Sequence, residues 1–554
     1  MNVSAASKAQ NIERFVALAL ASIYLFIFNR TLPDGDALRV VRQITANDLQ
    51  WNPNHLLFDP LGYAWHGILS AVGFTIEPLA SFEAISAIAT LASLWIFHRV
   101  LCELEISRFP RLLVLAGLFA SAGFLVTSVG QYFFMVQMPF LLGALLYIVK
   151  WLRGGTAAPA ARRHLLIAGM LTAIATTIMF NNLFLVLLLG AALCSVRTAD
   201  GRWGFSNTLY FGAGAAVVGL PVFIAGYALY GAGGGFFNWL LSYQGEAGSS
   251  LNDLYGTKAN LGSIAEAAAQ VIYNLLVGNQ LETAGLGPVL SVLVFGKGLE
   301  FEPNWTRVII GAVLALLVAA LTAVTFLAAL RDFLKRPLVR LMVVWIAAYS
   351  LFNLMWSAPI EIFWFQMLPA VWLLAACMLG LVPTPGTGKP VRTLGNPARA
   401  AAMAFVALLF AVNTVNAVVP VSLTDVDGMS RAHRALLREG DLEILPGWDQ
   451  QKWIFVDKAE GISQFVLMNA AAFNKGARIR ELPAVVDAQL QAGKRVIVAR
   501  LYDRDPDMMP WYSLEKSGWP RAKLQELLAA HCNRVLGRVA DITFRELYLC
   551  EPKT

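Results

Sequence analysis

The chain has 554 residues, of which 57% are hydrophobic and only 14% are charged, and its mean hydropathy is +0.59. A soluble domain carries about 25% charged residues, so this composition excludes an ordinary soluble protein and predicts a polytopic membrane protein. The net charge of +7 is typical of Lys and Arg in cytoplasmic loops, so we expect no nucleic-acid partner. The five cysteines include no CxxC pair, which argues against a zinc site or a redox motif.

The first apolar segment, Phe15–Phe28, is not followed by an A-x-A-like cleavage site. We therefore expect a retained first span rather than a cleaved signal peptide. A membrane crossing needs about 20 apolar residues, and this criterion predicts about eleven transmembrane helices. They are expected at 13–30, 79–101, 111–129, 131–152, 164–179, 181–197, 207–230, 305–330, 338–356, 360–382 and 401–419.

The first predicted outer loop, residues 31–78, places several ionisable groups beside the bilayer. Asp34 and Asp36 flank Gly35 directly after Pro33, a sequence that favours a tight turn. Charged groups at this depth need water, a partner or a function. A carboxylate here can act as a general base, and the pair offers hard oxygen ligands to Mg²⁺ or Mn²⁺. A solvated turn is the alternative.

Basic and polar residues continue this loop. Arg39 and Arg42 are three residues apart in ALRVVRQI, a short amphipathic pattern that places both on one helix flank. They can bind an anionic head group, or pair with an acidic neighbour or ordinary phospholipid. Asn54 and His55 follow, and a histidine here can contact a phosphate, transfer a proton or form a structural hydrogen bond. The segment 56–73 is predicted to be an interfacial helix.

Lys and Arg are distributed unevenly between alternate loops. The connections HRVLCELEISRFPR, KWLRGGTAAPAARRH and RDFLKRPLVR are basic, whereas GQ, NN and SAPIE contain no Lys or Arg. This bias predicts a multi-pass protein of the cytoplasmic (inner) membrane with a cytoplasmic N-terminus. The loop 31–78, the loop 231–304 and the tail then face the outer side. Lys258 in the second of these can meet a phosphate as a point charge.

The chain is predicted to contain a transmembrane module at 1–420 and a small extracytoplasmic α/β domain at 421–554. Strands are expected in KWIFVD, KRVIVARLYD and DITFRELYLC, and helices in MSRAHRALLREG, LPAVVDAQLQAGK and PRAKLQELLAAHC. Cys532 and Cys550 both belong to this tail. If the tail is outside the cytoplasm they can form a disulfide, and otherwise they are two unpaired thiols.

These features resemble the GT-C superfamily of integral-membrane glycosyltransferases, which use polyprenyl-phosphate sugars. The shared pattern is a first span, an outer loop with an acidic DGD near its start, interfacial helices and a second span like ASFEAISAIATLASLWIFHRVL. A larger outer loop after the seventh span and a soluble outer domain complete it. Many members have a Glu before a Tyr near the start of the fourth span. This chain has Gln131 in GQYFF there, a departure from the pattern.

The resemblance also implies functional residues. In the family an acidic residue of the first outer loop is the proposed catalytic base or orients the acceptor, which points here to Asp36 or to Asp34. The segment SAPIEIFWFQMLP resembles a region that approaches the donor in several members. Glu361, Trp364 and Gln366 are therefore candidates for substrate binding. The alternative is that these three residues cap span ends, where Trp is common.

The reaction implied by the resemblance is inverting transfer of a hexosyl or pentosyl group outside the membrane. The donor is a polyprenyl-phosphate sugar and the acceptor is an envelope glycan, lipid or protein. Asp36 takes the acceptor's proton. The charge of the departing phosphate is met by Arg39, Arg42, His55 or Lys258. A multi-span transporter and a non-catalytic cell-envelope assembly protein are the alternatives.

Overall fold

The computed structural model describes part of the chain and divides it into two compact units. The described residues are 3–28, 55–76, 78–129, 133–154, 159–196, 203–230, 235–240, 335–356, 364–382, 395–419, 435–445, 462–467, 477–500, 534–539 and 545–550, with isolated residues between them. One unit, here called the helical unit, comprises 1–31, 54–228 and 257–422. The other, the sheet unit, comprises 32–53, 229–256 and 423–554.

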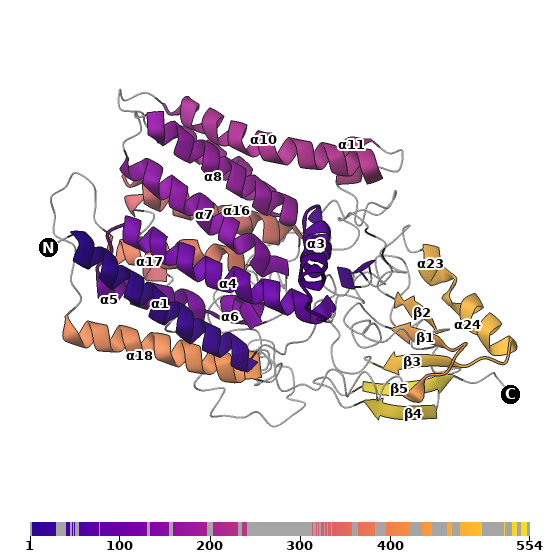
Figure 1. The fold of residues 1–554 in the computed structure, drawn as a ribbon. Coiled ribbons are helices and arrows are strands. Elements are labelled where there is room, and N and C mark those ends of the chain that lie inside the picture. The colour runs from indigo at the N-terminus through magenta and orange to yellow at the C-terminus, as the bar shows by residue number, and fades with distance from the viewer. Residues whose placement is uncertain are drawn as a thin grey trace. The chain divides into compact units, whose positions relative to one another are not determined.

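Long apolar helices that run side by side make up the helical unit (Figure 1). In chain order they are α1 Val3–Phe28, α3 Phe58–Ala71, α4 Pro78–Glu103, α5 Arg108–Ala120, α6 Ala122–Val129, α7 Phe133–Arg153, α8 Pro159–Ile178, α9 Asn182–Cys194, α10 Phe205–Tyr230, α16 Pro337–Trp356, the short 3₁₀ turn η4 Phe365–Met367, α17 Leu368–Met378, α18 Asn396–Asn413 and the π-helical turn η5 Thr414–Val418. The helix α7 packs against both α4 and α8, and α16 packs against α9.

The described helices support a multi-pass membrane protein. Five of them are long and apolar enough to cross a membrane, and a sixth span results if α5 and α6 count as one crossing. Three shorter apolar helices are Asn182–Cys194, Pro337–Asn353 and Phe365–Met378. Each expected span coincides with one of these helices or with α8, except 305–330, most of which lies outside the described residues. The span count of about eleven stays a prediction from segment length.

The helix α3 lies across the ends of the long helices rather than parallel to them (Figure 1). Its Phe58 ring lies 5.8 Å from the Phe82 ring of α4, and its Trp65 Nε1 donates to the Ser81 carbonyl at 2.8 Å. Asp59 and Gly62 are buried on the same side, whereas Ile68 is exposed. This one-sided burial fits the amphipathic helix expected at 56–73.

One expected span, 111–129, is bent by 64° between α5 and α6. Ser121 lies at the bend, and its Oγ donates to the Gly117 carbonyl at 2.8 Å and accepts from Trp372 Nε1 at 3.0 Å. Asn413 Nδ2 donates to the Ala120 carbonyl at 2.8 Å. A bend inside a membrane exposes backbone groups that lipid cannot satisfy, and these side chains satisfy them.

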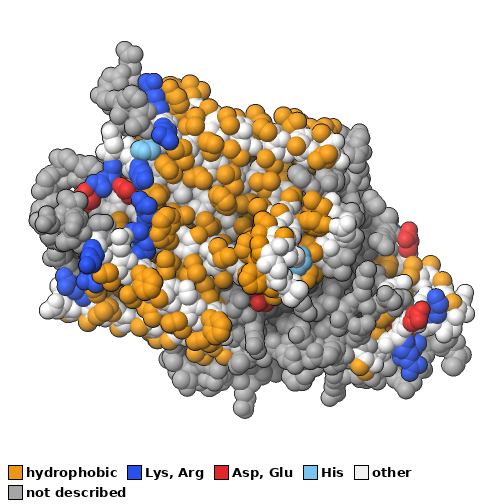
Figure 2. Space-filling model, viewed as in Figure 1, with side chains coloured by type: hydrophobic (Ala, Val, Ile, Leu, Met, Phe, Trp, Pro, Cys, Tyr) orange, Lys and Arg blue, Asp and Glu red, His pale blue; other side chains and the backbone are white. Residues whose placement is uncertain are grey.

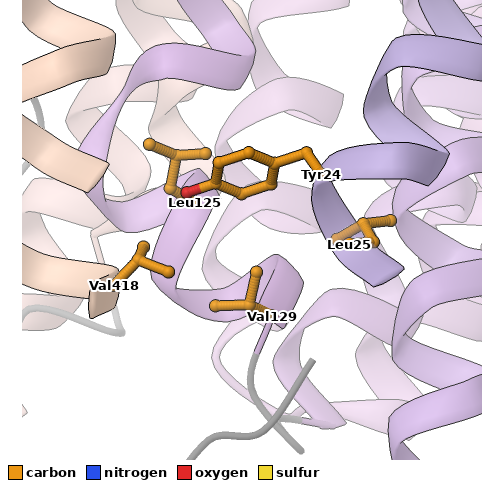
Figure 3. Packing of buried hydrophobic residues seen from close by; sticks show 5 residues of the cluster. All are labelled: Tyr24, Leu25, Leu125, Val129 and Val418. Carbon is orange, nitrogen blue, oxygen red and sulfur yellow. The ribbon is translucent and has the colours of Figure 1, made fainter. Parts of the chain in front are cut away.

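The bent segment packs on the first helix through a small apolar cluster (Figure 3). Tyr24 and Leu25 of α1 meet Leu125 and Val129 of α6 and Val418 of η5. The Tyr24 hydroxyl also hydrogen-bonds the Thr414 hydroxyl at 3.2 Å. The start and the end of the helical unit's chain are therefore joined at this bend.

The sheet unit contains a five-stranded mixed sheet in the order β2-β1-β3-β5-β4. Its strands are β1 Leu442–Leu445, β2 Ser463–Val466, β3 Val496–Arg500, β4 Arg534–Val539 and β5 Arg545–Cys550, with helices α11 Phe236–Leu240, α23 Ala477–Arg480 and α24 Leu482–Gln491 in the same unit. The strand β1 pairs in parallel with β2 and β3, whereas β5 is antiparallel to β3 and β4.

Part of this sheet was expected. KRVIVARLYD contains β3, DITFRELYLC contains β5 and LPAVVDAQLQAGK contains α24. KWIFVD lies outside the described residues, as do Cys532 and most of the two other expected helices. The strands β1, β2 and β4 were not expected from the sequence. A partly buried ion pair between Arg495 Nη2 and Asp441 Oδ2, 2.6 Å apart, joins the starts of β1 and β3.

Candidate functional site

Most of the residues singled out from the sequence lie outside the described part of the chain. This holds for Asp34, Asp36, Arg39, Arg42, Asn54, Lys258 and Glu361, and for Gln131. Their roles stay predictions. His55, Trp364 and Gln366 are described, and all three belong to the helical unit.

Polar side chains without charge gather at the end of the helical unit where α7 begins, α8 ends and α9 begins. We call this group the amide cluster, and its members are Gln137 of α7, Asn181 and Asn182 of the α8–α9 turn, Tyr349 of α16 and Gln366 of η4. Each is at most 3% exposed. Polar groups buried within a membrane helix bundle are costly and commonly functional, so this cluster is the candidate site among the described residues.

Asn182 is the centre of the amide cluster. Its Nδ2 donates to the Gln137 side-chain oxygen and to the carbonyls of Ala175 at 2.9 Å and Met179 at 3.0 Å. Its Oδ1 accepts a hydrogen bond from the Tyr349 hydroxyl. Asn182 therefore links α7, α8 and α16, and its own hydrogen-bonding capacity is used within the protein.

Two other members of the cluster retain unused hydrogen-bonding atoms. Asn181 is 3% exposed, and neither its Oδ1 nor its Nδ2 has a partner among the described residues. The same holds for Oε1 of Gln366, which is fully buried. A buried polar group left unpaired costs about 1–3 kcal/mol. These atoms can accept and donate hydrogen bonds to hydroxyl groups of a bound molecule.

Trp364 and Gln366 lie next to each other around η4. Trp364 is 1% exposed, and its carbonyl accepts from the Met367 amide at 3.1 Å. The Gln366 carbonyl accepts from Trp345 Nε1 at 3.0 Å, and its Nε2 lies 3.7 Å from Met179 Sδ. The segment therefore approaches the α8–α9 turn, and of the three residues suggested there, Gln366 joins the amide cluster.

His55 connects the first predicted outer loop to this end of the unit. It is half-buried and lies two residues before Leu57, whose amide donates to the Thr177 carbonyl at 2.9 Å. Thr177 lies in the last turn of α8, two residues before Met179. This part of the loop 31–78 is thus joined to the helix that leads into the amide cluster.

Sequence reasoning missed Gln137, Asn181, Asn182 and Tyr349 as site residues. It looked for charge, and these side chains have none. The sequence does contain a clue to them. An amide side chain within an apolar span is uncommon, and the dipeptide NN separates two spans. Sequence reasoning also gave no role to Asp59, which is fully buried in the first turn of α3, where a carboxylate is favoured by the helix dipole.

The described residues contain no group of three or more His, Cys, Asp or Glu side chains that could hold a metal ion. The Mg²⁺ or Mn²⁺ ligands suggested by the sequence, Asp34 and Asp36, lie outside those residues.

Comparisons with known proteins identify the fold. No protein-family model matches the chain, and no curated protein matches it. Among solved structures, ArnT from Cupriavidus metallidurans bound to undecaprenyl phosphate is 14% identical, with a TM-score of 0.55 over 97% of both chains. The Archaeoglobus fulgidus oligosaccharyltransferase tethered with an acceptor peptide is 14% identical, with a TM-score of 0.54 over 98% of this chain and 74% of its own. This chain therefore has the fold of the GT-C integral-membrane glycosyltransferases, which confirms the resemblance drawn from its sequence.

Proposed function

We propose that this chain is a GT-C-type membrane glycosyltransferase. It moves a sugar from a polyprenyl-phosphate donor to an envelope glycan, lipid or protein on the extracytoplasmic side of the cytoplasmic membrane. The observation that carries the proposal is the fold likeness over 97% of the chain to a protein bound to undecaprenyl phosphate. A second protein with this fold was captured with an acceptor peptide. A polyprenyl phosphate and an acceptor peptide thus both have precedents as bound molecules on this fold.

The proposed chemistry uses the first outer loop. Asp36, or its neighbour Asp34, accepts the proton of the attacking acceptor hydroxyl. The hydroxyl attacks the anomeric carbon, the bond to the phosphate oxygen breaks, and the single displacement inverts the configuration. Arg39, Arg42, His55 and Lys258 stabilise the charge that develops on the departing polyprenyl phosphate. A Mg²⁺ or Mn²⁺ ion held by the two carboxylates is an alternative role for them.

In this proposal the amide cluster binds the sugar through hydrogen bonds from uncharged side chains. Sugars present hydroxyl groups that both donate and accept, as do the unpaired amide atoms of Asn181 and Gln366. Glu361 and Trp364 precede Gln366 in the sequence and belong to the same substrate-binding segment. The hydrogen bond from the Leu57 amide to the Thr177 carbonyl supports placing this part of the first loop beside the cluster.

The two predicted domains and the topology belong to the same proposal. Residues 1–420 form the catalytic membrane module, and 421–554 form an extracytoplasmic domain that binds acceptor. The basic side chains Arg99, Arg108, Lys150, Arg153, Arg162 and Arg163 lie near the ends of helices opposite the amide cluster. Figure 2 shows Lys and Arg gathered at that end. This distribution supports a cytoplasmic N-terminus.

A deletion strain tests the proposal. Its envelope glycans and glycolipids are compared by mass spectrometry after complementation, at equal expression, with wild type, Asp36→Asn, Asp34→Asn or Glu105→Gln. We expect one sugar mass to be lost on deletion and restored by wild type and by Glu105→Gln, an exposed carboxylate between α4 and α5. Asp36→Asn should not restore it, because an amide cannot accept the proton.

Other outcomes would change the assigned base or reject the transferase function. Full restoration by Asp36→Asn together with failure of Asp34→Asn would make Asp34 the base. If deletion changes no glycan, the transferase reading is wrong. Substrate flux through the purified protein in vesicles would then indicate a transporter, and its absence would indicate an assembly protein.

A further inference from the structure

Two arginines share one tryptophan at the end of the helical unit opposite the amide cluster. The guanidinium carbon of Arg14 on α1 lies 5.8 Å from the ring centroid of Trp95, and that of Arg99 on α4 lies 5.4 Å from it. Trp95 is 38% exposed, and both arginines are half-buried. An indole face attracts cations, so both guanidinium groups are held at this partly exposed ring.

The nearby carboxylate does not neutralise this pair. Glu13 is 4% exposed, and its Oε1 lies 2.9 Å from Arg108 Nε while its Oε2 lies 2.6 Å from Arg111 Nη2. Both of its oxygens are therefore engaged by α5. Among the described residues neither Arg14 nor Arg99 forms a salt bridge, and Arg14 donates from Nε to His98 Nδ1 at 3.4 Å.

Two other arginines at this end pair with carboxylates within the protein. Arg153 donates to the Glu103 carbonyl and pairs with Glu105. Arg336 pairs with Asp332 at 3.5 Å. The pair on Trp95 differs because, among the described residues, no carboxylate forms a salt bridge with either guanidinium group. A bound anion that contacts both groups would lower the repulsion between their positive charges.

The surroundings of the pair are apolar rather than aqueous. Phe15, next to Arg14, is 74% exposed, and Ile12 is 54% exposed on the same end of α1. Ile88 of α4 is 52% exposed and lies seven residues before Trp95, so the two share a face. Tryptophan is typical of the lipid head-group level. An anion that reaches this pair therefore most naturally carries an acyl chain.

We propose that Arg14, Trp95 and Arg99 form a binding site for the phosphate of an anionic phospholipid in the leaflet at this end of the helices. The two guanidinium groups donate to the phosphate oxygens, a geometry that arginine provides better than lysine. The acyl chains lie along the exposed residues of α1 and α4. Basic pockets between transmembrane helices commonly bind such head groups. This site is independent of the proposed transferase reaction.

Native mass spectrometry of the purified full-length protein in neutral detergent tests the site. Phosphatidylglycerol is added, with phosphatidylcholine as the zwitterionic comparison. We expect wild type to retain phosphatidylglycerol selectively, and Arg14→Gln/Arg99→Gln to weaken its binding at least about tenfold. Arg162→Gln/Arg163→Gln removes the same charge from exposed positions at the start of α8 and should leave binding unchanged.

Three other results would overturn the proposed phospholipid site. An equal loss in the two double variants would overturn the site, because binding would then reflect only the basic end of the protein. Full competition by inorganic phosphate would also overturn it, because the site would hold a free aqueous anion. If the double variant does not fold, Arg99→Gln alone serves, since its described contact is with the Trp95 ring. Unchanged phosphatidylglycerol binding by that variant would refute the proposal.

Discussion

Asn181 and Asn182 are neighbours in the sequence with opposite surroundings. Asn182 exchanges hydrogen bonds with Gln137, Tyr349 and two backbone carbonyls, whereas both amide atoms of Asn181 are unpaired among the described residues. Removing one partner from a satisfied network leaves the others buried and unpaired, while removing an already unpaired group costs little. Asn182 should therefore matter for the stability of the protein, and Asn181 for the binding of substrate.

We predict that Asn182→Ala lowers the free energy of unfolding by about 2 kcal/mol. Asn181→Ala should change it by less than about 0.5 kcal/mol and lower transferase activity at subsaturating substrate. Thermal unfolding in detergent measures the first effect, and complementation of the glycan defect measures the second. A large loss of stability in Asn181→Ala would show that its amide has a structural partner and is not available to a sugar.

Glu13 forms one ion pair with a buried arginine and another with an exposed arginine. Its carboxylate is 2% exposed and pairs with Arg111, which is 8% exposed, and with Arg108, which is 71% exposed. The Arg111 guanidinium also donates to the Ile106 carbonyl at 2.9 Å, so it is fixed in place. Loss of the carboxylate leaves that cation buried without its counter-charge.

Glu13→Gln should accordingly destabilise the helical unit by about 3–5 kcal/mol. Arg108→Gln should cost less than about 1 kcal/mol, because its charge is mostly in solvent and Arg111 still holds the carboxylate. Thermal unfolding of both variants in the same detergent measures the ratio. Equal effects of the two substitutions would mean that Arg111 and Glu13 do not form a buried pair.

At the scale of elements, the crossing of α8 and α10 depends on two glycines. A Cβ on Gly169 would overlap the Phe211 carbonyl oxygen, and a Cβ on Gly214 would overlap the Leu166 carbonyl oxygen. Helix backbones approach this closely in membranes only through small residues. Because both obstacles are backbone atoms, no side-chain rotation can relieve the overlap.

Gly214→Ala should therefore destabilise the protein by about 1–3 kcal/mol, as overpacking does elsewhere. Gly212, two residues away in the same helix, has nothing within 4 Å of its hypothetical Cβ. Gly212→Ala is the matched control and should be neutral or slightly stabilising, since alanine favours a helix. The midpoints of thermal unfolding of the two variants give the comparison. A tolerated Gly214→Ala would mean that α8 and α10 are farther apart.

Some elements of the fold could be predicted from the sequence, because a membrane-spanning helix must be apolar over its length. The long helices α1, α4, α7, α8, α10 and α18 were predictable because each is an apolar segment near 20 residues long. The bend at Ser121 was not, because it depends on Trp372 and Asn413, which are remote in sequence. The strands β1 and β2 have only four residues each, which is too short for an alternating pattern to be distinctive.

The candidate site was predictable only where it carries charge. Asp34 and Asp36 attract notice in any sequence reading, whereas Gln137 and Asn182 are hidden among apolar residues. Gln366 was reached through the family resemblance and not through its own chemistry. Its contacts with Trp345 and Met179 depend on how η4 lies against α16 and the α8–α9 turn. Such tertiary packing has no local signal in the sequence.

At the scale of the whole molecule, the helical unit has two chemically different ends. One end holds the buried, uncharged amide cluster and the helix α3, which lies across the helix ends. The other holds the basic side chains and the buried Glu13–Arg111 pair. In the proposed function the amide cluster faces the outer side, where the reaction takes place. The basic end then faces the cytoplasm, as expected for Lys and Arg in a membrane protein.

This asymmetry predicts the orientation of the protein in the membrane. Ser70 on α3 and Ser107 before α5 are both exposed, and Ser107 makes no capping hydrogen bond. The span α4 separates them, so they should lie on opposite sides. In intact spheroplasts, a membrane-impermeant maleimide should label Ser70→Cys strongly and Ser107→Cys only after permeabilisation. Wild type provides the background from the five native cysteines. The reverse pattern would place the amide cluster in the cytoplasm, where it could not serve an extracytoplasmic transfer, and it would refute the proposed side of the reaction while leaving the fold unaffected.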